Sequence, residues 1–340
     1  MGTIVGFGDL LVSLAPRGYL RFVQADGFDV NYTGAEANVL VSLSTFGLKT
    51  EMVTRLPENP ISQCAINCLR RFGVGTEKIV FGGERIGVIY TEKGASQRPS
   101  SVVYDRKHTS IVTASPEDFD WDSIFADAEW FHFTGITAAL SDSDAAICLE
   151  ACRKAKEKGI TVSCDLNYRK KLWTPEKAGS VMKKLVKYAD VLVANEEDAE
   201  KVLGIRSEGT DVENGKLNRE GYIKVARRIC GEFGVKQVAI TLRESRSASD
   251  NGWSALLFDG DRAFFSREYD IHIVNRVGGG DSFTAGLIYA LYKGYDAQHA
   301  IEFAAAASCL KHSIENDFNL VTVSEAEALA AGNASGRVQR

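Results

Sequence analysis

Residues 275–283 read Asn-Arg-Val-Gly-Gly-Gly-Asp-Ser-Phe. They follow a strand-like stretch, Tyr269–Val274, and precede an apolar helical pattern, Phe283–Tyr292. Three consecutive glycines let the backbone turn sharply and let neighbouring N–H groups point into one space. The amino end of the next helix adds partial positive charge. The segment therefore predicts a strand–turn–helix unit that binds an anion such as a transferring phosphoryl group.

Asp281 lies at the rim of this turn, where its carboxylate can take a proton from a hydroxyl group. The backbone N–H groups of Gly278, Gly279 and Gly280 would then stabilise the charge on the transferring group. The alternative is a plain glycine turn in which Asp281 caps the following helix. Local spacing alone leaves both interpretations open.

The rest of the chain alternates short apolar runs with helical patterns, which indicates a parallel sheet covered by helices on both faces. We expect a single α/β domain over residues 1–330 and a loose tail over residues 331–340. The predicted strands are 3–8, 50–54, 129–134, 160–165, 190–194 and 237–242, and the predicted helices are 35–46, 61–72, 142–158, 175–188 and 219–233.

Two regions, about 14–33 and 84–113, break this alternation. They contain extended, partly alternating stretches such as Ile86–Tyr90 and Ser101–Tyr104. We interpret them as antiparallel strands that project from the main sheet. A projecting sheet beside a cleft is a natural lid, and we expect a homo-oligomer formed through this lid.

Composition narrows the class of protein. The 340 residues are 45% hydrophobic and 25% charged, which is ordinary for a globular protein. The net charge is −5 and no basic tract stands out, so we expect neither nucleic acid nor a membrane as a partner. Seven scattered cysteines suit reduced thiols, and no apolar run is long enough to cross a bilayer. We expect a cytoplasmic protein.

Four segments resemble, in order, the motifs of ribokinase-like (PfkB) carbohydrate kinases. Residues 34–38 (GAEAN) resemble the GGxxxN segment that contacts the sugar, and residues 165–169 (DLNYR) resemble the DxNxR strand end. Residues 195–198 (NEED) resemble the NxxE motif, and residues 275–283 resemble DTxGAGDxF, whose last Asp is the general base. The resemblance spans roughly residues 3–320. It implies a three-layer fold with a mainly parallel central sheet, a small β-sheet lid, and phosphoryl transfer from ATP with Mg²⁺.

Within that family, the sequence resembles 2-keto-3-deoxygluconate kinases through VYDR at residues 103–106 and DLNYRKKLW at residues 165–173. The resemblance implies that two lid tyrosines and two arginines hold the carboxylate and hydroxyls of a sugar acid. A guanidinium matches a carboxylate with a planar fork, and a neutral sugar would not need two. The alternative is surface ion pairs and ordinary lid packing. The four matching positions are Tyr90, Tyr104, Arg106 and Arg169.

The resemblance implies phosphorylation of the primary hydroxyl of 2-keto-3-deoxy-D-gluconate, giving 2-keto-3-deoxy-6-phosphogluconate. The alternatives are a kinase for a neutral sugar such as fructose or ribose, and a catalytically silent binding homologue. The other implied sugar contacts are Asp9, Gly34, Ala35, Asn38, Asn167 and Asp281. The implied nucleotide contacts are Asn195, Thr241, Arg243, Ser245, Gly278 and Gly280, and the implied metal contacts, through water, are Glu197 and Asp198.

The sequence departs from the family's pattern at four places. Asn275 and Arg276 replace the leading Asp and Thr, and that Asp commonly helps to bind a monovalent cation, so we expect little dependence on potassium. Asp198 replaces a longer glutamate. Residues 241–245 (TLRES) replace a glycine-rich TLGxxG, and Ala305 replaces an adenine-contacting Asn.

Overall fold

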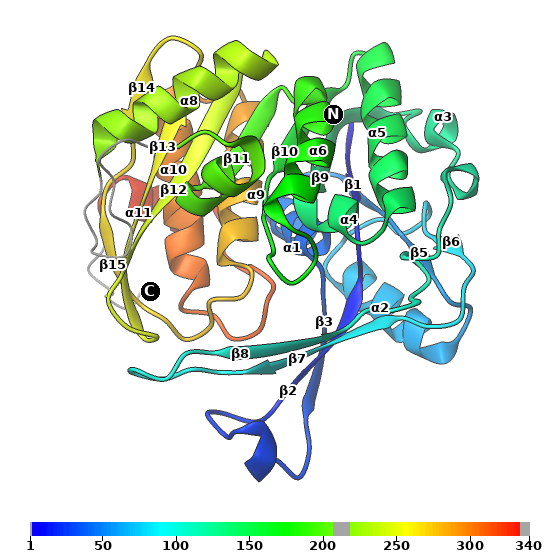
Figure 1. The fold of residues 1–340 in the computed structure, drawn as a ribbon. Helices are drawn as coiled ribbons and strands as arrows, with labels where there is room; N and C mark the ends of the chain where they lie inside the picture. Colours follow the sequence, from blue (N-terminus) through cyan, green and yellow to red (C-terminus); the bar gives the residue numbers. More distant parts are fainter. Residues whose placement is uncertain (1, 207–217, 334–340) are drawn as a thin grey trace.

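The structure, a computed structural model, describes residues 2–206 and 218–333, which form a nine-stranded central sheet (Figure 1). Its parallel part has the order β4-β1-β9-β10-β11-β12, and β13 continues it antiparallel and pairs with β14 and β15. The bounds are β1 Thr3–Phe7, β4 Thr50–Val53, β9 Ala128–Thr134, β10 Thr161–Asp165, β11 Val191–Asn195, β12 Gln237–Ser245, β13 Asp250–Phe258, β14 Ala263–Phe265 and β15 Tyr269–His272.

Helices cover both faces of this sheet, because successive side chains of each strand point to opposite sides. Trp130 and Phe131, neighbours on β9, belong to separate hydrophobic cores. The Phe131 face carries α3 Trp121–Ile124, α4 Gly135–Ala139, α5 Asp142–Glu157, α6 Pro175–Leu185 and α8 Arg219–Phe233. The Trp130 face carries α1 Ala35–Thr45, α2 Pro60–Arg71, α9 Gly279–Tyr292, α10 Ala297–Lys311 and α11 Val323–Ala330. The predicted three-layer α/β fold is confirmed.

One predicted boundary, the start of the helix that follows the glycine motif, is wrong. Helix α9 begins at Gly279, whereas the sequence predicted a start at Phe283. Glycine has a low helix propensity, which made these residues resemble a loop. Gly279, Gly280 and Asp281 therefore form the first helical turn, whose N–H groups have no acceptor within the helix.

A separate four-stranded sheet, in the order β3-β2-β7-β8, projects below the carboxyl ends of the central strands (Figure 1). Strands β2 and β7 pair in parallel, although the sequence analysis predicted an antiparallel lid. Both strands leave the domain in the same direction, and each then returns through an antiparallel partner. The bounds are β2 Leu11–Ala15, β3 Asp29–Thr33, β7 Gly87–Glu92 and β8 Ser101–Asp105, and a further short pair is β5 Arg55–Leu56 with β6 Val80–Phe81.

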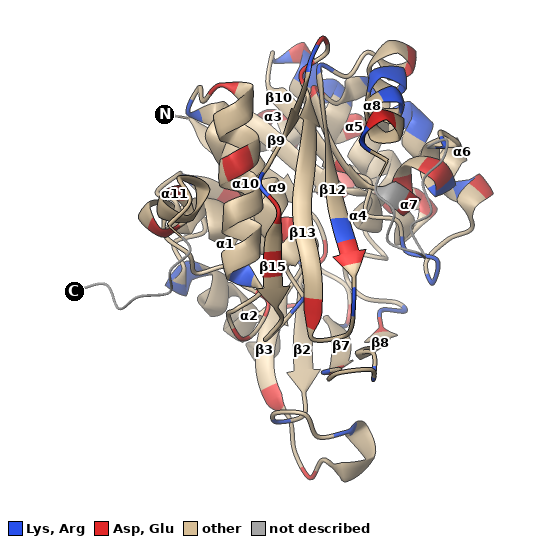
Figure 2. Cartoon of the chain, turned by 90° about the vertical axis from the view of Figure 1, so that its left-hand side faces the viewer, with Lys and Arg blue, Asp and Glu red and all other residues tan. Residues whose placement is uncertain are grey.

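Acidic and basic residues are interspersed over the face shown in Figure 2. In residues 2–206 and 218–333, none of the helices has both the length and the apolar character needed to cross a membrane. Most of the predicted tail, residues 334–340, lies outside the described residues.

Candidate active site

The glycine motif forms a positively polarised turn at the amino end of α9. Gly278 precedes the helix with a φ of +78°, a conformation that favours glycine, and a Cβ there would lie 2.0 Å from the carbonyl oxygen of Asp317. Space is open beside Gly280, where a Cβ would meet nothing within 4 Å. The N–H groups of Gly280 and Asp281 belong to the unpaired first turn. An anion placed against this turn would meet donors and the positive end of the helix dipole.

Asp281, in the first turn of α9, is hydrogen-bonded to an amide on the neighbouring helix α1. Its Oδ2 accepts a hydrogen bond of 2.6 Å from Nδ2 of Asn38 on α1. Burial raises the pKa of Asp281 to about 6, while Asn38 and then Arg169 oppose that rise. Helix α9 has no side-chain cap, so Asp281 does not act as the capping residue of the alternative interpretation. A carboxylate with this pKa is suited to accept a proton near neutral pH.

The lid supplies a guanidinium to the same cleft. Nε of Arg106 lies 3.1 Å from Oδ2 of Asp9, and its guanidinium stacks 4.3 Å from the centre of the Tyr104 ring. Burial raises the pKa of Asp9 although the guanidinium opposes the rise. The structure therefore joins Asp9, which lies between β1 and β2, to a lid residue 97 positions later.

A cavity of about 290 Å³ lies between β8 and the loop after β10. Tyr104 and Arg106 enter it from the lid, and Arg169 enters it from the core. Arg169 is also close enough to lower the pKa of Asp281. The complete lining is Val102, Tyr104, Arg106, Tyr168, Arg169, Lys170, Lys171, Leu172 and Glu197.

The remaining predicted sugar residues shape the backbone beside this cleft. Gly34 precedes α1, and a Cβ there would lie 2.0 Å from the carbonyl oxygen of Asp9, so only glycine permits this approach. Ala35 is the first residue of α1. Asn167 has a φ of +39°, and its N–H donates to Oδ1 of Asp165 at 3.0 Å. These residues position the neighbouring donors and acceptors of the cleft.

The family resemblance places Tyr90 and Tyr104 together at the sugar, but the two side chains lie on different faces of the lid sheet. In the β7–β8 register Tyr90 is opposite Val103, while Tyr104 is opposite Ile89. Residues directly opposite one another share a face of the sheet, so Tyr90 lies on the outer face and Tyr104 on the inner one. Tyr90 packs against Phe28, with ring centres 6.1 Å apart.

Four of the predicted nucleotide residues lie on β11 and β12, and the other two, Gly278 and Gly280, lie at the start of α9. Thr241 pairs with Asn195 across these strands, and Arg243 and Ser245 are exposed further along β12. Oδ1 of Asn195 accepts the N–H groups of residues 197 and 198, so this end of the side chain caps a short helix.

Arg276 adds a second cation to this area, although the sequence analysis treated it only as a departure from the family pattern. Burial lowers the pKa of Arg276, and the charge of Arg243 lowers it further, so the two guanidinium groups lie near one another. Nη2 of Arg276 donates to the carbonyl oxygen of Ala248 at 2.9 Å. Two neighbouring cations, Arg276 in the turn before α9 and Arg243 on β12, favour phosphate oxygens.

The predicted metal residues take different roles. Asp198 is buried, and its two oxygens accept backbone N–H groups of Tyr168 at 2.9 Å and Asn195 at 3.2 Å. Glu197 is exposed and lines the cavity. Burial raises the pKa of Asp165 well above its usual value, and the charges of Asp198 and Asp281 raise it further. In the described part of the chain, no three His, Cys, Asp or Glu side chains gather as a direct metal site.

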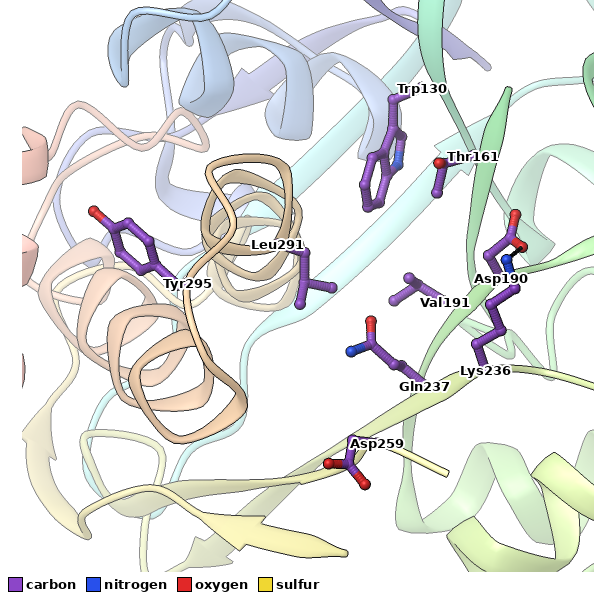
Figure 3. Close-up of a pocket in the computed structure, with 9 residues that line it drawn as sticks. All are labelled: Trp130, Thr161, Asp190, Val191, Lys236, Gln237, Asp259, Leu291 and Tyr295. Carbon is purple, nitrogen blue, oxygen red and sulfur yellow. Dashed lines mark ion pairs between the residues drawn. The ribbon is translucent and has the colours of Figure 1, made fainter. Parts of the chain in front are cut away.

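A second cavity, of about 450 Å³, lies at the amino ends of the central strands and therefore at the opposite edge of the sheet (Figure 3). Trp130, Thr161 and Val191 stand at the starts of β9, β10 and β11, and Leu291 stands at the end of α9. Ligands of open α/β sheets bind at the carboxyl ends of the strands. This rule favours a site around Asp281 over this cavity.

The fold and the site define an enzyme that transfers a phosphoryl group to a sugar hydroxyl. The family model of the pfkB family carbohydrate kinases matches residues 3–316, and the chain belongs to this family.

Relatives of this chain share nearly its whole length. The 2-dehydro-3-deoxygalactonokinase of Haloferax volcanii is 30% identical over 333 residues, covering 98% of each chain. The 2-dehydro-3-deoxygluconokinase of Thermoproteus tenax is 28% identical, covering 93% of this chain and 90% of its own. The crystal structure of 2-dehydro-3-deoxygluconokinase from Thermotoga maritima has a TM-score of 0.94 and 51% identity, covering 97% of this chain and 98% of that one.

Proposed function

We propose that this carbohydrate kinase transfers the γ-phosphoryl group of ATP to the primary hydroxyl of 2-keto-3-deoxy-D-gluconate. The product is 2-keto-3-deoxy-6-phosphogluconate. The observation that carries the proposal is the cavity in which Arg106 from the lid and Arg169 from the core lie together with Tyr104. The names of the relatives from Thermoproteus tenax and Thermotoga maritima support the same substrate, and that of the Haloferax volcanii relative favours its galacto epimer.

A carboxylate must lose water to enter this cavity, and that loss is costly unless charged donors replace the water. Two guanidinium groups supply such donors, and each charge-assisted hydrogen bond contributes about 1.5–3 kcal/mol. Because Arg106 is already paired with Asp9, the substrate carboxylate would share this guanidinium or displace Asp9. Binding the acid would thereby tie the lid to the core.

In the proposed reaction Asp281 accepts the proton of the primary hydroxyl as that oxygen bonds to the γ-phosphorus of ATP. The bond between the γ-phosphorus and the bridging oxygen breaks, and ADP leaves with that oxygen. The N–H groups of Gly280 and Asp281 stabilise the charge of the transferring group. Arg243 and Arg276 attract the remaining phosphate oxygens.

The carboxylates of Asp198 and Asp281 lie near that of Asp165 and repel it. A nearby Mg²⁺ would reduce this repulsion, so these residues fit the ion. Both oxygens of Asp198 already accept backbone N–H groups, so Asp198 and the exposed Glu197 would reach the ion through water. Mg²⁺ commonly keeps several waters beside phosphate ligands. When bound, it would neutralise charge on the ATP phosphates.

The test is kcat/KM for the sugar acid and for fructose in the wild type, Arg106→Ala and Arg169→Ala. We expect each substitution to lower kcat/KM for the acid by roughly ten- to a hundredfold. The loss on fructose, if it reacts, should be much smaller. The matched control is Arg153→Ala, which removes an exposed surface guanidinium paired with Glu157.

A wild type that prefers the neutral sugar would refute the acid assignment, as would equal losses on both substrates. A substrate panel that contains the gluco and galacto epimers of the keto-deoxy acid shows which epimer this enzyme prefers. The family assignment does not depend on either result.

The outer face of the lid supports self-association, which we propose as the mode of assembly. Val30, Leu14, Tyr90 and Val103 are aligned across the four lid strands, and Val30 and Val103 are 57% and 51% exposed. A second copy that pairs the same face would cover this row. Light scattering should show that Val103→Asp converts an oligomer to a monomer, whereas a monomeric wild type contradicts the proposed self-association.

The cytoplasmic location stays a prediction.

A further inference from the structure

A buried lysine lies directly behind the anion-binding turn. Lys311 is the last residue of α10, and its side chain has no exposed surface. Its Nζ lies 3.3 Å from the carbonyl oxygen of Asn275 and 3.4 Å from that of Ile314. Within residues 2–206 and 218–333, no carboxylate forms an ion pair with this ammonium group. A buried ammonium held mainly by carbonyl oxygens is costly, so its position calls for a functional reason.

The two carbonyl groups belong to the two backbone segments that form the base of the turn. Asn275 opens the glycine motif, and the loop after Ile314 reaches Asp317, whose carbonyl oxygen would be 2.0 Å from a Cβ on Gly278. That same Cβ would be 3.4 Å from Cε of Lys311. Lys311 therefore contacts both segments and lies beside the close approach of Gly278 to Asp317.

The same loop also contacts the lid. Glu315 forms an ion pair with Lys93, which follows β7. Oδ1 of Asn316 accepts a hydrogen bond of 3.0 Å from Nδ2 of Asn31 on β3. Burial raises the pKa of Asp317, and the side chain of Thr33 on β3 opposes that rise, so this strand also lies beside the loop. A continuous set of contacts thus runs from the lid through the loop to Lys311 and the turn.

The charge of Lys311 is influenced by three acidic residues, Asp317, Asp281 and Glu315. Burial lowers the pKa of Lys311 to about 8, while Asp317 and then Asp281 oppose that fall. The ammonium group is therefore still mainly protonated at pH 7. Its positive charge lies behind the turn against which a phosphoryl group would be placed.

We propose that Lys311 is a built-in monovalent cation that holds the anion-binding turn in its catalytic arrangement and transmits the position of the lid to it. Lys311 is a positioning residue, because its ammonium group contacts the backbone and not the reacting atoms. The inference rests on the proposed phosphoryl transfer. It requires that the enzyme work without any added monovalent metal ion, since the chain supplies the charge itself.

The experiment uses wild type, Lys311→Met and Lys311→Ala in chloride salts of potassium, methylammonium and tetramethylammonium at one ionic strength. Wild type should be equally active in all three salts. Lys311→Met should fold, since replacing a buried charge by an apolar side chain of similar volume is often neutral or stabilising. Its kcat should fall by about a hundredfold, with KM for the sugar within about threefold of wild type.

Lys311→Ala leaves a space for a small cation, so methylammonium or potassium should restore its kcat by about tenfold or more, and the bulkier tetramethylammonium should not. The control, Lys177→Met, removes an exposed lysine paired with Asp142 and should behave as wild type. Loss of most wild-type activity in tetramethylammonium would overturn the inference, as would a folded Lys311→Met with kcat within about threefold of wild type. If the wild type phosphorylates only a neutral sugar, the proposed acid substrate is wrong, and the Lys311 variants are then compared on that neutral sugar. A wild type inactive on every sugar would refute the proposed function and this inference together.

Discussion

The core and the lid meet at the cleft, and a carboxylate lies in each region with a different kind of partner. On the core, Asp281 accepts a hydrogen bond from the neutral amide of Asn38, and burial raises its pKa to about 6. Beside the lid, Asp9 is paired with the cationic guanidinium of Arg106. Burial raises the pKa of both carboxyl groups, but one oxygen of Asp9 is occupied by a guanidinium 3.1 Å away, whereas Asp281 is hydrogen-bonded to a neutral amide. Asp281 is therefore suited to chemistry, whereas the lid, together with Arg169 of the core, is suited to recognition.

The backbone of the two regions differs as well. The turn before α9 is fixed by a close approach to Asp317, by the Lys311 ammonium group and by Ser308, whose hydroxyl donates to the carbonyl oxygen of Gly279 at 2.7 Å. The lid is a small sheet that meets the core through side-chain pairs that include Arg106 with Asp9 and Lys93 with Glu315. Substitutions at the turn before α9 should therefore change kcat, and substitutions in the lid should change KM.

The largest effect should come from Asp281→Asn. We expect kcat to fall by at least about a hundredfold, the lower limit for loss of a general base, while sugar affinity stays within a few-fold. Single-turnover kinetics separate the two quantities. The control is Asp142→Asn, which changes an exposed carboxylate in the first turn of α5. If Asp281→Asn kept more than about a tenth of the wild-type kcat, Asp281 would not be the base.

The next prediction compares two glycines of the same turn. Gly278→Ala places a Cβ against the backbone of Asp317 at a positive φ, so unfolding free energy should fall by more than about 2 kcal/mol. Gly280→Ala places its Cβ in open space within the first turn of α9, and its unfolding free energy should stay within about 0.5 kcal/mol. Urea denaturation of both variants measures the difference. Equal stabilities would show that the close approach is absent in solution.

The pH profile of kcat/KM tests the state of Asp281. A base must be deprotonated, so activity should fall as pH decreases through about 6, by about tenfold per unit below it. Asn38 lowers this pKa, so Asn38→Ala should move the acid limb to higher pH. Thermal unfolding over the same pH range controls for buried Glu36, whose pKa burial raises to about 7. An acid limb of kcat/KM near pH 4, the usual pKa range of aspartate, would contradict the raised pKa of Asp281 as the base.

The sequence predicted the core of this site better than the lid, for physical reasons. Buried strands and the helices between them have apolar periods that are visible locally, so strands such as Gln237–Ser245 were located to within a few residues. Pairing between distant positions leaves no such local signal, and the contact of Arg106 with Asp9 depends on tertiary structure. Lys311 resembles an ordinary lysine in the last turn of a helix, which favours cations, and its burial appears only in the structure.

The smallest predicted effect concerns the two lid tyrosines, which the family resemblance groups together and the β7–β8 register separates. Tyr104 lies under the Arg106 guanidinium on the cavity side, so Tyr104→Ala removes both a wall and a cation–π contact worth about 0.5–2 kcal/mol. We expect its KM for the sugar acid to rise about tenfold. Tyr90 lies on the outer face against Phe28, so Tyr90→Ala should change KM less than about threefold.

Steady-state kinetics should be measured over a range of enzyme concentrations. If the enzyme assembles through the outer face of the lid, removing Tyr90 should change activity mainly where dilution dissociates the oligomer, whereas Tyr104→Ala should act equally at every concentration. An equal rise of KM in both variants at all concentrations would mean that Tyr90 reaches the sugar. The register would then be a poor guide to the lid in its closed state, and the division between a recognising inner face and an assembling outer face would fail.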